Sequence, residues 1–591
     1  MKKQFHRLYA IFAMIGCLLA SAPSGAQNIS QIAKSDPLLI TGAIGTSNTY
    51  YHSSLGSDYT TPFSNTIYAN LNISLYGFSM PFSFYYSNNN VSFNYPKFSF
   101  NISPTYKNWR LYLGRRSMAF SNYVFNLPFN GVGLEYQGAS FRFGAFYGTL
   151  RNAINDDPEN PIARSPQYQR VGWGAKVGLG NSSNYLDFYF LRAKDDINSI
   201  SATWHEADFL SMHGITDPFA QENMVVGAKG RLSLKNYVSL TGNVATSVFS
   251  TDINSQIIPM ERFQRWDKVF EARYSSLARF AGDLALNFNL GSFATALQYK
   301  IIQPDYKSLG ASYMTNNIQS LGAVANWILF KRLTLSGSFA QQSDNLNNQQ
   351  MYTTKGFVYT AGAGLSLGSH LSLSAYYNGY LQCQYDGAAI INDTIRVDRK
   401  MDSYTFSPSY SFYNDSYSHT ISVSGCYASN KDLNPFTSAE NHTDVNTLSS
   451  GVSYGLGLLD LGTDIMTAYS HQESVGYGYH YQTEVVSAGA SHAFLEDKTL
   501  DVSLTLNCCF NKIDEQDRNV SIGGDLTVGY TLKDVHVFSF SAGYNKFNDI
   551  NILAGANYGY SALTMSLNYN YAFTLLQIKR KAEEATVEIQ Y

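Results

Sequence analysis

The chain has 591 residues, of which 15% are aromatic and only 14% charged, and its formal net charge is −3. The charged fraction is well below the quarter or so that is usual in soluble domains, so a set of compact soluble domains is disfavoured. The near-neutral charge also excludes the electrostatic footprint of a nucleic-acid-binding protein. The abundant Tyr, Phe, Gly, Ser and Asn suit β-surfaces with one apolar face and one uncharged polar face.

Residues 1–26 are predicted to be a secretory signal peptide. Three Lys and Arg residues precede an apolar run at residues 8–20, and small residues at 24–26 complete a cleavage site. A lipoprotein signal around Cys17 is the alternative. After cleavage, no apolar run reaches the ~18 residues that a membrane helix needs. We therefore expect an exported chain without a helical anchor, in which residues 27–37 form a short periplasmic segment.

From Leu38 onward, apolar and polar residues alternate with a period of two. In residues 67–76, apolar side chains occupy every odd position, and Tyr, Asn and Ser occupy every even one. Residues 563–573 repeat the pattern near the other end of the chain. Such alternation predicts β-strands with one apolar face, so the predicted fold class is all-β.

The breaks between the predicted strands alternate between short turns and long loops, which is the layout of an outer-membrane β-barrel. We predict one antiparallel up-and-down transmembrane barrel over residues 38–591, with about 28 strands (range about 26–28), no N-terminal plug domain and both termini in the periplasm. The short turns are expected at residues 180–183, 235–236, 291–292, 368–370, 414–415, 460, 496–498, 533–534 and 560. The long extracellular loops are expected at residues 194–223, 251–276, 303–317, 342–351, 386–401, 430–444 and 471–479.

The end of the chain carries a further strand pattern. Val587, Ile589 and Tyr591 alternate with polar residues, and the final residue is aromatic. A terminal aromatic strand is similar to the signal by which outer-membrane barrels are recognised for insertion. We therefore expect the barrel-assembly machinery and the outer-membrane lipids to be partners of this chain.

Two segments carry a resemblance to a known group of proteins. They are "YLGRRSMAFSNY" at residues 112–123 and "GVGLEYQGASFRFGAFYG" at residues 131–148. They resemble a stretch of an uncharacterised family of very large, Tyr-rich outer-membrane β-barrels of the Bacteroidota. The resemblance implies an integral protein of the Gram-negative outer membrane, and it implies no catalytic residues.

Charged side chains predicted to face the lumen gather on three neighbouring strands. A two-residue turn at residues 138–139 would pair Glu135 with Arg142, on the same face as Arg110 and Arg116. This group could orient a cargo or partner, or it could be an ion pair that stiffens the wall. The candidate lumen cluster is Arg110, Arg116, Glu135 and Arg142.

Arg115 is left on the lipid-facing side by the same alternation. A charge at the middle of the bilayer would cost about 2–4 kcal/mol, whereas at the rim it would cost little. Either Arg115 lies high enough to contact outer-leaflet phosphates, or a bulge at Gly114 turns both arginines inward.

Two long loops have patterns typical of short amphipathic helices. Thr203 and Glu206 have capping-box spacing, and Pro259 suits the start of a helix over residues 259–277. Each helix could fold inward as a gate, form a surface platform or simply pack on its own loop. The candidate gate residues are Trp204, Leu210, Met212, Phe263, Trp266, Phe270 and Tyr274.

No metal or catalytic constellation is indicated. His205 and His213 are eight residues apart, whereas the helix-borne zinc motif needs two histidines four apart. The cysteines that remain after cleavage match no metal-site spacing and are expected to be free thiols. Because no nucleophile, base and orienting group stand out, we expect a protein that is not an enzyme, with no catalytic residue, metal or cofactor.

The size of the predicted barrel shapes the functional hypothesis. Barrels of 16–18 strands already hold a water channel, so a wider lumen would leak unless loops, a protein partner or a cargo filled it. We expect a conduit or docking component for macromolecule export or surface assembly. The alternatives are a porin-like diffusion or nutrient channel gated by infolded loops, and a structural surface or adhesion protein.

Overall fold

The computed structural model describes residues 38–55, 62–89, 97–155, 166–200, 218–235, 237–259, 269–440, 443–495, 497, 499–551 and 556–578. These residues form 27 β-strands and one six-residue helix, α5 (Pro435–Glu440), between β20 and β21. The strands are β1 (Leu38–Ser53), β2 (Phe63–Leu75), β3 (Phe78–Ser87), β4 (Phe98–Ile102), β5 (Thr105–Tyr106), β6 (Trp109–Ser117), β7 (Pro128–Gln137), β8 (Phe141–Arg151), β9 (Gln169–Gly180), β10 (Tyr185–Asp196), β11 (Glu222–Leu234), β12 (Val238–Ser250), β13 (Ser276–Asn289), β14 (Phe293–Ile302), β15 (Ile318–Leu329), β16 (Leu333–Asp344), β17 (Tyr352–Leu367), β18 (Leu371–Asp386), β19 (Arg399–Tyr413), β20 (Tyr417–Asp432), β21 (Val445–Leu458), β22 (Thr463–Gly476), β23 (Tyr479–Phe494), β24 (Leu500–Ile513), β25 (Gln516–Leu532), β26 (His536–Asn551) and β27 (Ala556–Ile578).

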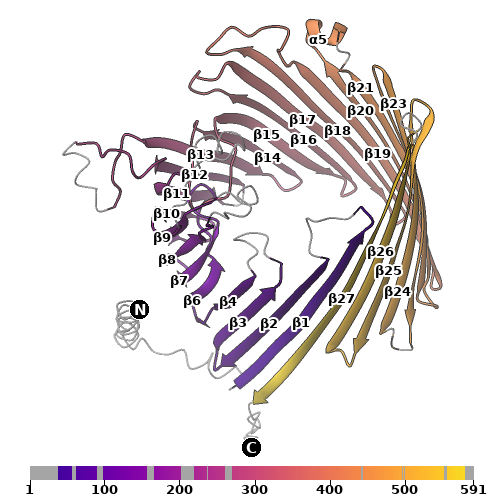
Figure 1. Cartoon of the computed structure of the whole chain (residues 1–591), viewed down its shortest axis with the longest axis horizontal. Coiled ribbons are helices and arrows are strands. Elements are labelled where there is room, and N and C mark those ends of the chain that lie inside the picture. The colour runs from indigo at the N-terminus through magenta and orange to yellow at the C-terminus, as the bar shows by residue number, and fades with distance from the viewer. Residues whose placement is uncertain are drawn as a thin grey trace, which may run out of the picture.

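The strands lie side by side in chain order, each antiparallel to the next, and form a ring (Figure 1). The ring closes where β27 pairs with β1, from Leu38 opposite Ile578 to Ser53 opposite Ala562. β4 and β5 occupy a single position, because both pair with β3 on one side and with β6 on the other. The described residues therefore form a closed barrel of 26 antiparallel strands, which confirms the predicted fold class.

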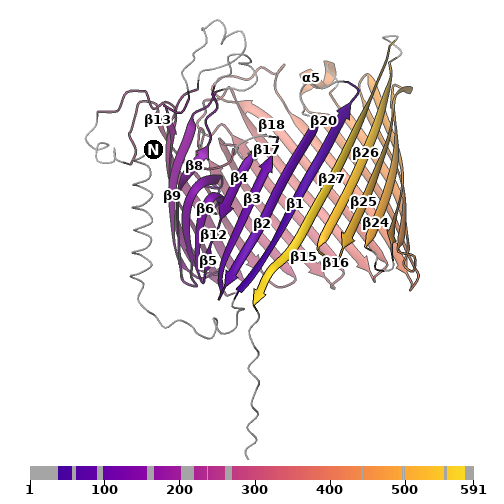
Figure 2. The same ribbon diagram turned by 60° about the horizontal axis from the view of Figure 1, so that its bottom comes forward.

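The two ends of the ring differ as the pattern of breaks predicts. Figure 2 shows the tilted strands from the side, with short turns at one end and longer connections at the other. Leu38 and Ile578 lie together at the end with the short turns. Closure satisfies the backbone hydrogen bonds of every strand without leaving an edge, which a bilayer requires.

Two of the predicted breaks are wrong. Tyr560 lies inside β27, where it pairs with Phe547 of β26 instead of forming a turn. The long loop expected at residues 471–479 is a two-residue turn, because β22 runs to Gly476 and β23 begins at Tyr479. Gly478 in this turn has a φ of +73°, which glycine adopts readily, so the hairpin can close tightly.

The strand register separates an inner face from an outer face. Phe129, Phe146 and Leu191 face the interior, since they are buried beneath segments that fold into the ring. Their neighbours along the strands face outward, and Tyr147 and Phe188 there are 59% and 53% exposed. Large apolar side chains without a protein partner on a closed β-surface are what a lipid-facing belt requires.

The inner wall of the other strands is lined mainly by uncharged polar side chains. Ser338 and Thr360 share a hydrogen bond of 2.8 Å across β16 and β17, and Thr447 and Ser474 share one of 2.9 Å across β21 and β22. Such pairs satisfy the hydroxyl groups within the wall and keep it wettable. The alternation therefore has the predicted sense, with the apolar face outside and the polar face inside.

Candidate functional site

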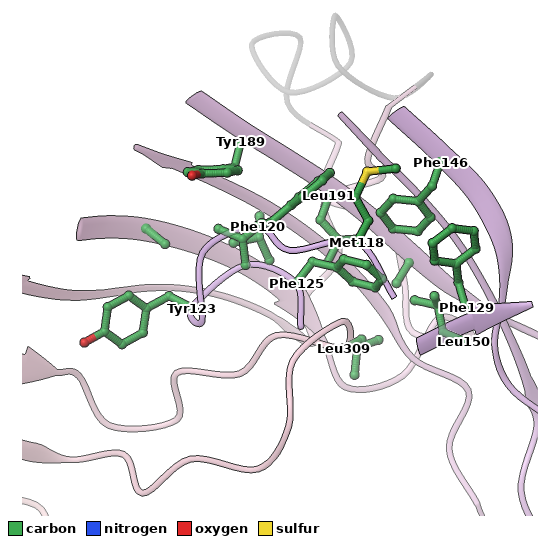
Figure 3. Close-up of a cluster of buried hydrophobic side chains, with 14 of the residues drawn as sticks. Met118, Phe120, Tyr123, Phe125, Phe129, Phe146, Leu150, Tyr189, Leu191 and Leu309 are labelled. Atoms are coloured by element: carbon green, nitrogen blue, oxygen red, sulfur yellow. The ribbon is translucent and has the colours of Figure 1, made fainter. Parts of the chain in front are cut away.

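Residues 118–127, which connect β6 to β7, fold into the barrel (Figure 3). The strand pattern ends at Ser117, and the apolar residues that follow no longer alternate. Phe125 is fully buried and stacks on Phe146 of β8, with 4.2 Å between the ring centroids. Because burying one such side chain stabilises a fold by about 1.5–3 kcal/mol, the segment is held firmly against the wall.

A second segment, residues 303–317 between β14 and β15, packs on the first. Tyr306 Oη donates to the carbonyl of Tyr123 at 2.8 Å, and Ser308 Oγ donates to the carbonyl of Val124 at 2.6 Å. A Cβ atom at Gly310 would lie 2.5 Å from the Leu191 side chain and 2.8 Å from that of Phe125, so a larger residue there would force these side chains to shift. We call residues 118–127 and 303–317 together the infolded pair.

The two tyrosines of the infolded pair are hydrogen-bond donors in a dry environment. Burial raises the pKa of the Tyr306 hydroxyl. Burial, and then a hydrogen bond to Asp283, raises the pKa of Tyr123 in the same way. Both hydroxyls therefore stay protonated and keep donating at any physiological pH.

The infolded pair is also tied to the inner faces of β11 and β12. Ser121 Oγ donates to Asn243 at 2.7 Å, and the backbone N–H of Leu309 donates to Asn223 at 3.0 Å. Ser247 Oγ donates to the carbonyl of Lys307 at 2.6 Å. Since these groups are buried, breaking a bond would leave an unsatisfied polar atom, and the pair is a fixed part of the wall.

The predicted pair of Glu135 and Arg142 is wrong. The turn is centred on residues 139–140, so Arg142 pairs with Gln137, and Glu135 pairs with Gly144. This shift of two residues keeps both side chains on the inner face but changes their partners.

Each of the two charges finds another partner on the wall. Glu135 accepts hydrogen bonds from Tyr112 and from Lys176, each at 2.5 Å. Arg142 forms an ion pair of 2.7 Å with Asp187. The Glu135–Lys176 ion pair is buried and the Arg142–Asp187 ion pair is part-buried, and both link strands close to the short-turn end.

Arg110, Arg115 and Arg116 all border one cavity of about 990 Å³ at the inner edge of β6. Arg110 and Arg116 are on the inner face, in register with Glu135 and Phe129 of β7. Arg115 is half-buried and borders the same cavity from the next position along the strand. The contact of Arg115 with outer-leaflet phosphates stays a prediction.

A charged group that the sequence interpretation missed lies beside the infolded pair. Asp195 is fully buried and forms ion pairs with Arg170 at 2.8 Å and Arg151 at 3.2 Å. A register shift after Thr149 turns Arg151 toward the interior. Burial, and then the charges of Arg170 and Arg151, lowers the pKa of Lys307. Strict alternation would have placed Arg151 outside, so no sequence signal marked this group.

Most of the predicted gate residues lie outside the described residues, namely Trp204, Leu210, Met212, Phe263 and Trp266. The terminal strand residues Val587, Ile589 and Tyr591 lie outside them as well. The described part of the second loop is not helical: Arg273 bridges to Ile257, and β13 begins at Ser276. There Phe270 is buried and Tyr274 is exposed, so the helical spacing predicted for them is wrong. The hydrogen bond from Arg273 to the carbonyl of Ser255 holds this stretch extended.

The described residues contain neither a metal-binding group nor a disulfide. No group of three or more His, Cys, Asp or Glu side chains among them is placed to hold a metal ion. Cys383, Cys426, Cys508 and Cys509 are free thiols, as expected. In the described part of the chain, no helix has the length and apolarity needed to span a membrane.

No protein-family model matches the chain, and no curated protein matches it. Among solved structures, OccAB3 from Acinetobacter baumannii is 12% identical with a TM-score of 0.31, over 60% of this chain and 93% of that one. OccK8 (OprE) from Pseudomonas aeruginosa is 10% identical with a TM-score of 0.31, over 60% and 93%. The outer membrane protein OpdK from Pseudomonas aeruginosa is 9% identical with a TM-score of 0.31, over 61% and 95%. Likenesses this weak do not establish a family.

Proposed function

We propose that the protein is an outer-membrane channel through which polar solutes diffuse, narrowed on one side by the infolded pair. The observation that carries the proposal is a closed ring of 26 strands with a polar inner wall, against which two fixed segments are packed. Barrel diameter grows with strand number, and smaller barrels of 16–18 strands already conduct water and solutes. The infolded pair covers the inner face from β6 to β15 and reduces the width of that passage.

The proposed location follows from the same geometry. The apolar outer belt fits a bilayer, and closed barrels of this kind are built for outer membranes. The long loops would face the outside and the short turns the periplasm, where Leu38 and Ile578 would lie. Outer-membrane lipids and the barrel-assembly machinery are the partners that this location requires.

Conductance of the purified full chain tests the proposal. Purified protein in a mild detergent is inserted into a planar lipid bilayer. We expect large and stable current steps, because the infolded pair is fixed and lines only one side of the lumen. Boiled protein is the control and should give none. A folded protein that purifies alone and never conducts would exclude the channel, and it would favour a structural surface or adhesion protein.

A second function, a conduit or docking component for macromolecule export, is supported by a different observation. Within the described residues, the buried apolar cluster lies against β6 to β15, and the polar inner faces of β16 to β27 have no comparable cover. A wide polar wall suits a protein or polysaccharide passenger or a partner chain. Purification in mild detergent separates the two functions: a chain that co-purifies and blocks conductance until it is removed supports the conduit.

A further inference from the structure

The cavity at β6 has an unusual balance of charge. Its wall includes Arg110, Arg115 and Arg116, and no Asp or Glu is among the described residues that border it. The remaining lining is uncharged, with Tyr112 and Ser117 among its polar residues. Arg110 and Arg116 both border this space, so a negative charge placed there would be favoured.

Glu135, the carboxylate opposite Arg110 in the register, is not available to neutralise Arg110. Its oxygens accept hydrogen bonds from Tyr112 and Lys176, both at 2.5 Å, and from Gln137 at 2.8 Å. Its charge is already balanced by Lys176, which forms the closest ion pair. Glu135 therefore does not offset the positive charge that Arg110 and Arg116 bring to the cavity.

Arg116 has an unused donor. Its Nε atom is buried, and it has no hydrogen-bond partner among the described residues. A buried donor without a partner costs about 1–3 kcal/mol, so a ligand that accepts this bond would recover free energy. Guanidinium groups bind planar or tetrahedral oxyanions through paired N–H donors, which makes carboxylates and phosphates the matching ligands.

The position of the cavity places it on the solute path. Asn126 and Ser312, one from each segment of the infolded pair, border it and bond to each other at 2.8 and 3.2 Å. Arg110 and Arg116 are six residues apart on one strand, so their Cα atoms are separated by roughly 20 Å along the wall. The site therefore extends along the strand beside the narrowed part of the lumen.

We propose that this cavity binds the oxyanion groups of a solute, carboxylate or phosphate, with Arg116 and Arg110 as the binding residues. The passage of that solute rests on the proposed channel, whereas its binding does not. The spacing of the two arginines suits a solute with more than one anionic group.

Calorimetric titration of the full chain in a neutral detergent tests the site, with inorganic phosphate and citrate as probes. Saturable binding is expected for the wild type, and Arg116→Gln and Arg110→Gln should each weaken it about tenfold or more. Arg116→Lys keeps the positive charge but loses the paired N–H donors of the guanidinium group, so its affinity should lie between that of the wild type and that of Arg116→Gln. Arg399→Gln is the matched control, because Arg399 is an exposed arginine at the start of β19, far from the cavity. Heat-modifiable gel mobility verifies that each variant is folded.

Three results would overturn the site. The first is that the folded wild type shows no saturable binding. The second is that Arg399→Gln weakens binding as much as Arg116→Gln or Arg110→Gln does. The third is that the protein binds vesicles of anionic lipid but not free phosphate. Conductance separates this proposal from the channel itself. A protein that binds phosphate but never conducts contradicts the proposed channel and supports the proposed binding site. A protein that conducts but does not bind phosphate contradicts the binding site and supports the channel.

Discussion

Gly114, which precedes Arg115 in β6, has a backbone conformation that residues other than glycine rarely adopt. Its φ is +86°, and pairing between β4 and β6 ends at this residue, where Asn101 is its partner. Within the described residues, the last residues of β6 pair with β7 alone, and their register with β7 continues without a shift. The register of β6 with β7 therefore contains no bulge of the kind considered from the sequence, and Gly114 instead takes up a positive φ within the strand.

Replacing Gly114 tests the need for this conformation. Alanine there would be strained at positive φ, and its Cβ would lie 2.2 Å from the carbonyl oxygen of Phe100. We expect Gly114→Ala to lower the free energy of unfolding by about 2–3 kcal/mol. Gly291→Ala is the control, since Gly291 has a φ of +80° but open space around it. It should cost only about 1 kcal/mol.

Urea unfolding followed by heat-modifiable gel mobility measures both variants. Equal losses would mean that the approach of the Phe100 carbonyl contributes nothing beyond the backbone strain.

At the scale of the elements, the infolded pair depends on aromatic packing between distant segments. Phe125 of the first segment stacks on Phe146 of β8, and Phe129 of β7 stacks on the same ring at 4.7 Å. Met118 and Leu309 complete the cluster from the two segments (Figure 3). The strands of the wall are held together by backbone hydrogen bonds to their neighbours. Loss of this cluster should therefore loosen the infolded pair without opening the barrel.

Phe125→Ala tests that separation. Removing a buried ring costs about 3–5 kcal/mol, and here the cost falls on the docking of residues 118–127. Limited proteolysis should become faster in this segment, and the current through the channel should become noisier. Phe188→Ala removes an outward-facing ring of the same size and should change neither readout. Unchanged protease resistance in Phe125→Ala would show that the hydrogen bonds alone hold the segment.

The element scale also shows where sequence interpretation succeeded and where it did not. Most strands and turns follow from alternation and from Gly, Asn and Asp at the turns, because both signals are local. The turn after β7 lies one residue later in the chain than the sequence predicts. Glu135 and Arg142 therefore have different partners from those predicted, but both still face the interior. Register depends on contacts between strands, and a period of two cannot distinguish two registers that differ by two residues.

At the scale of the whole molecule, stability depends on the seam between β1 and β27. The two strands pair along the full length of β1, with one irregularity after Ile40. A closed ring has no edge strand, so a break at the seam would expose unpaired backbone groups to lipid. The barrel should therefore fold as a ring or not at all.

Ala43→Pro tests the seam, because Ala43 pairs with Asn70 on one side and Ala572 on the other. Proline cannot donate to the ladder and is poorly tolerated in a central strand. We expect this variant to lose the heat-modifiable, folded form on gels and to be degraded in cells. Leu55→Pro, just beyond the end of β1, should fold normally. A folded, conducting Ala43→Pro barrel would show that the seam is not essential.

The sequence by itself determined the class of fold and the two faces of the wall, because alternation is a local property and a lipid-facing sheet has to close. It also placed Arg110, Arg116, Glu135 and Arg142 on the inner face. Only the tertiary structure decided which segments fold inward and which charges pair. Those outcomes depend on contacts such as that of Tyr306 with Tyr123, between segments far apart in the chain, which no local pattern encodes.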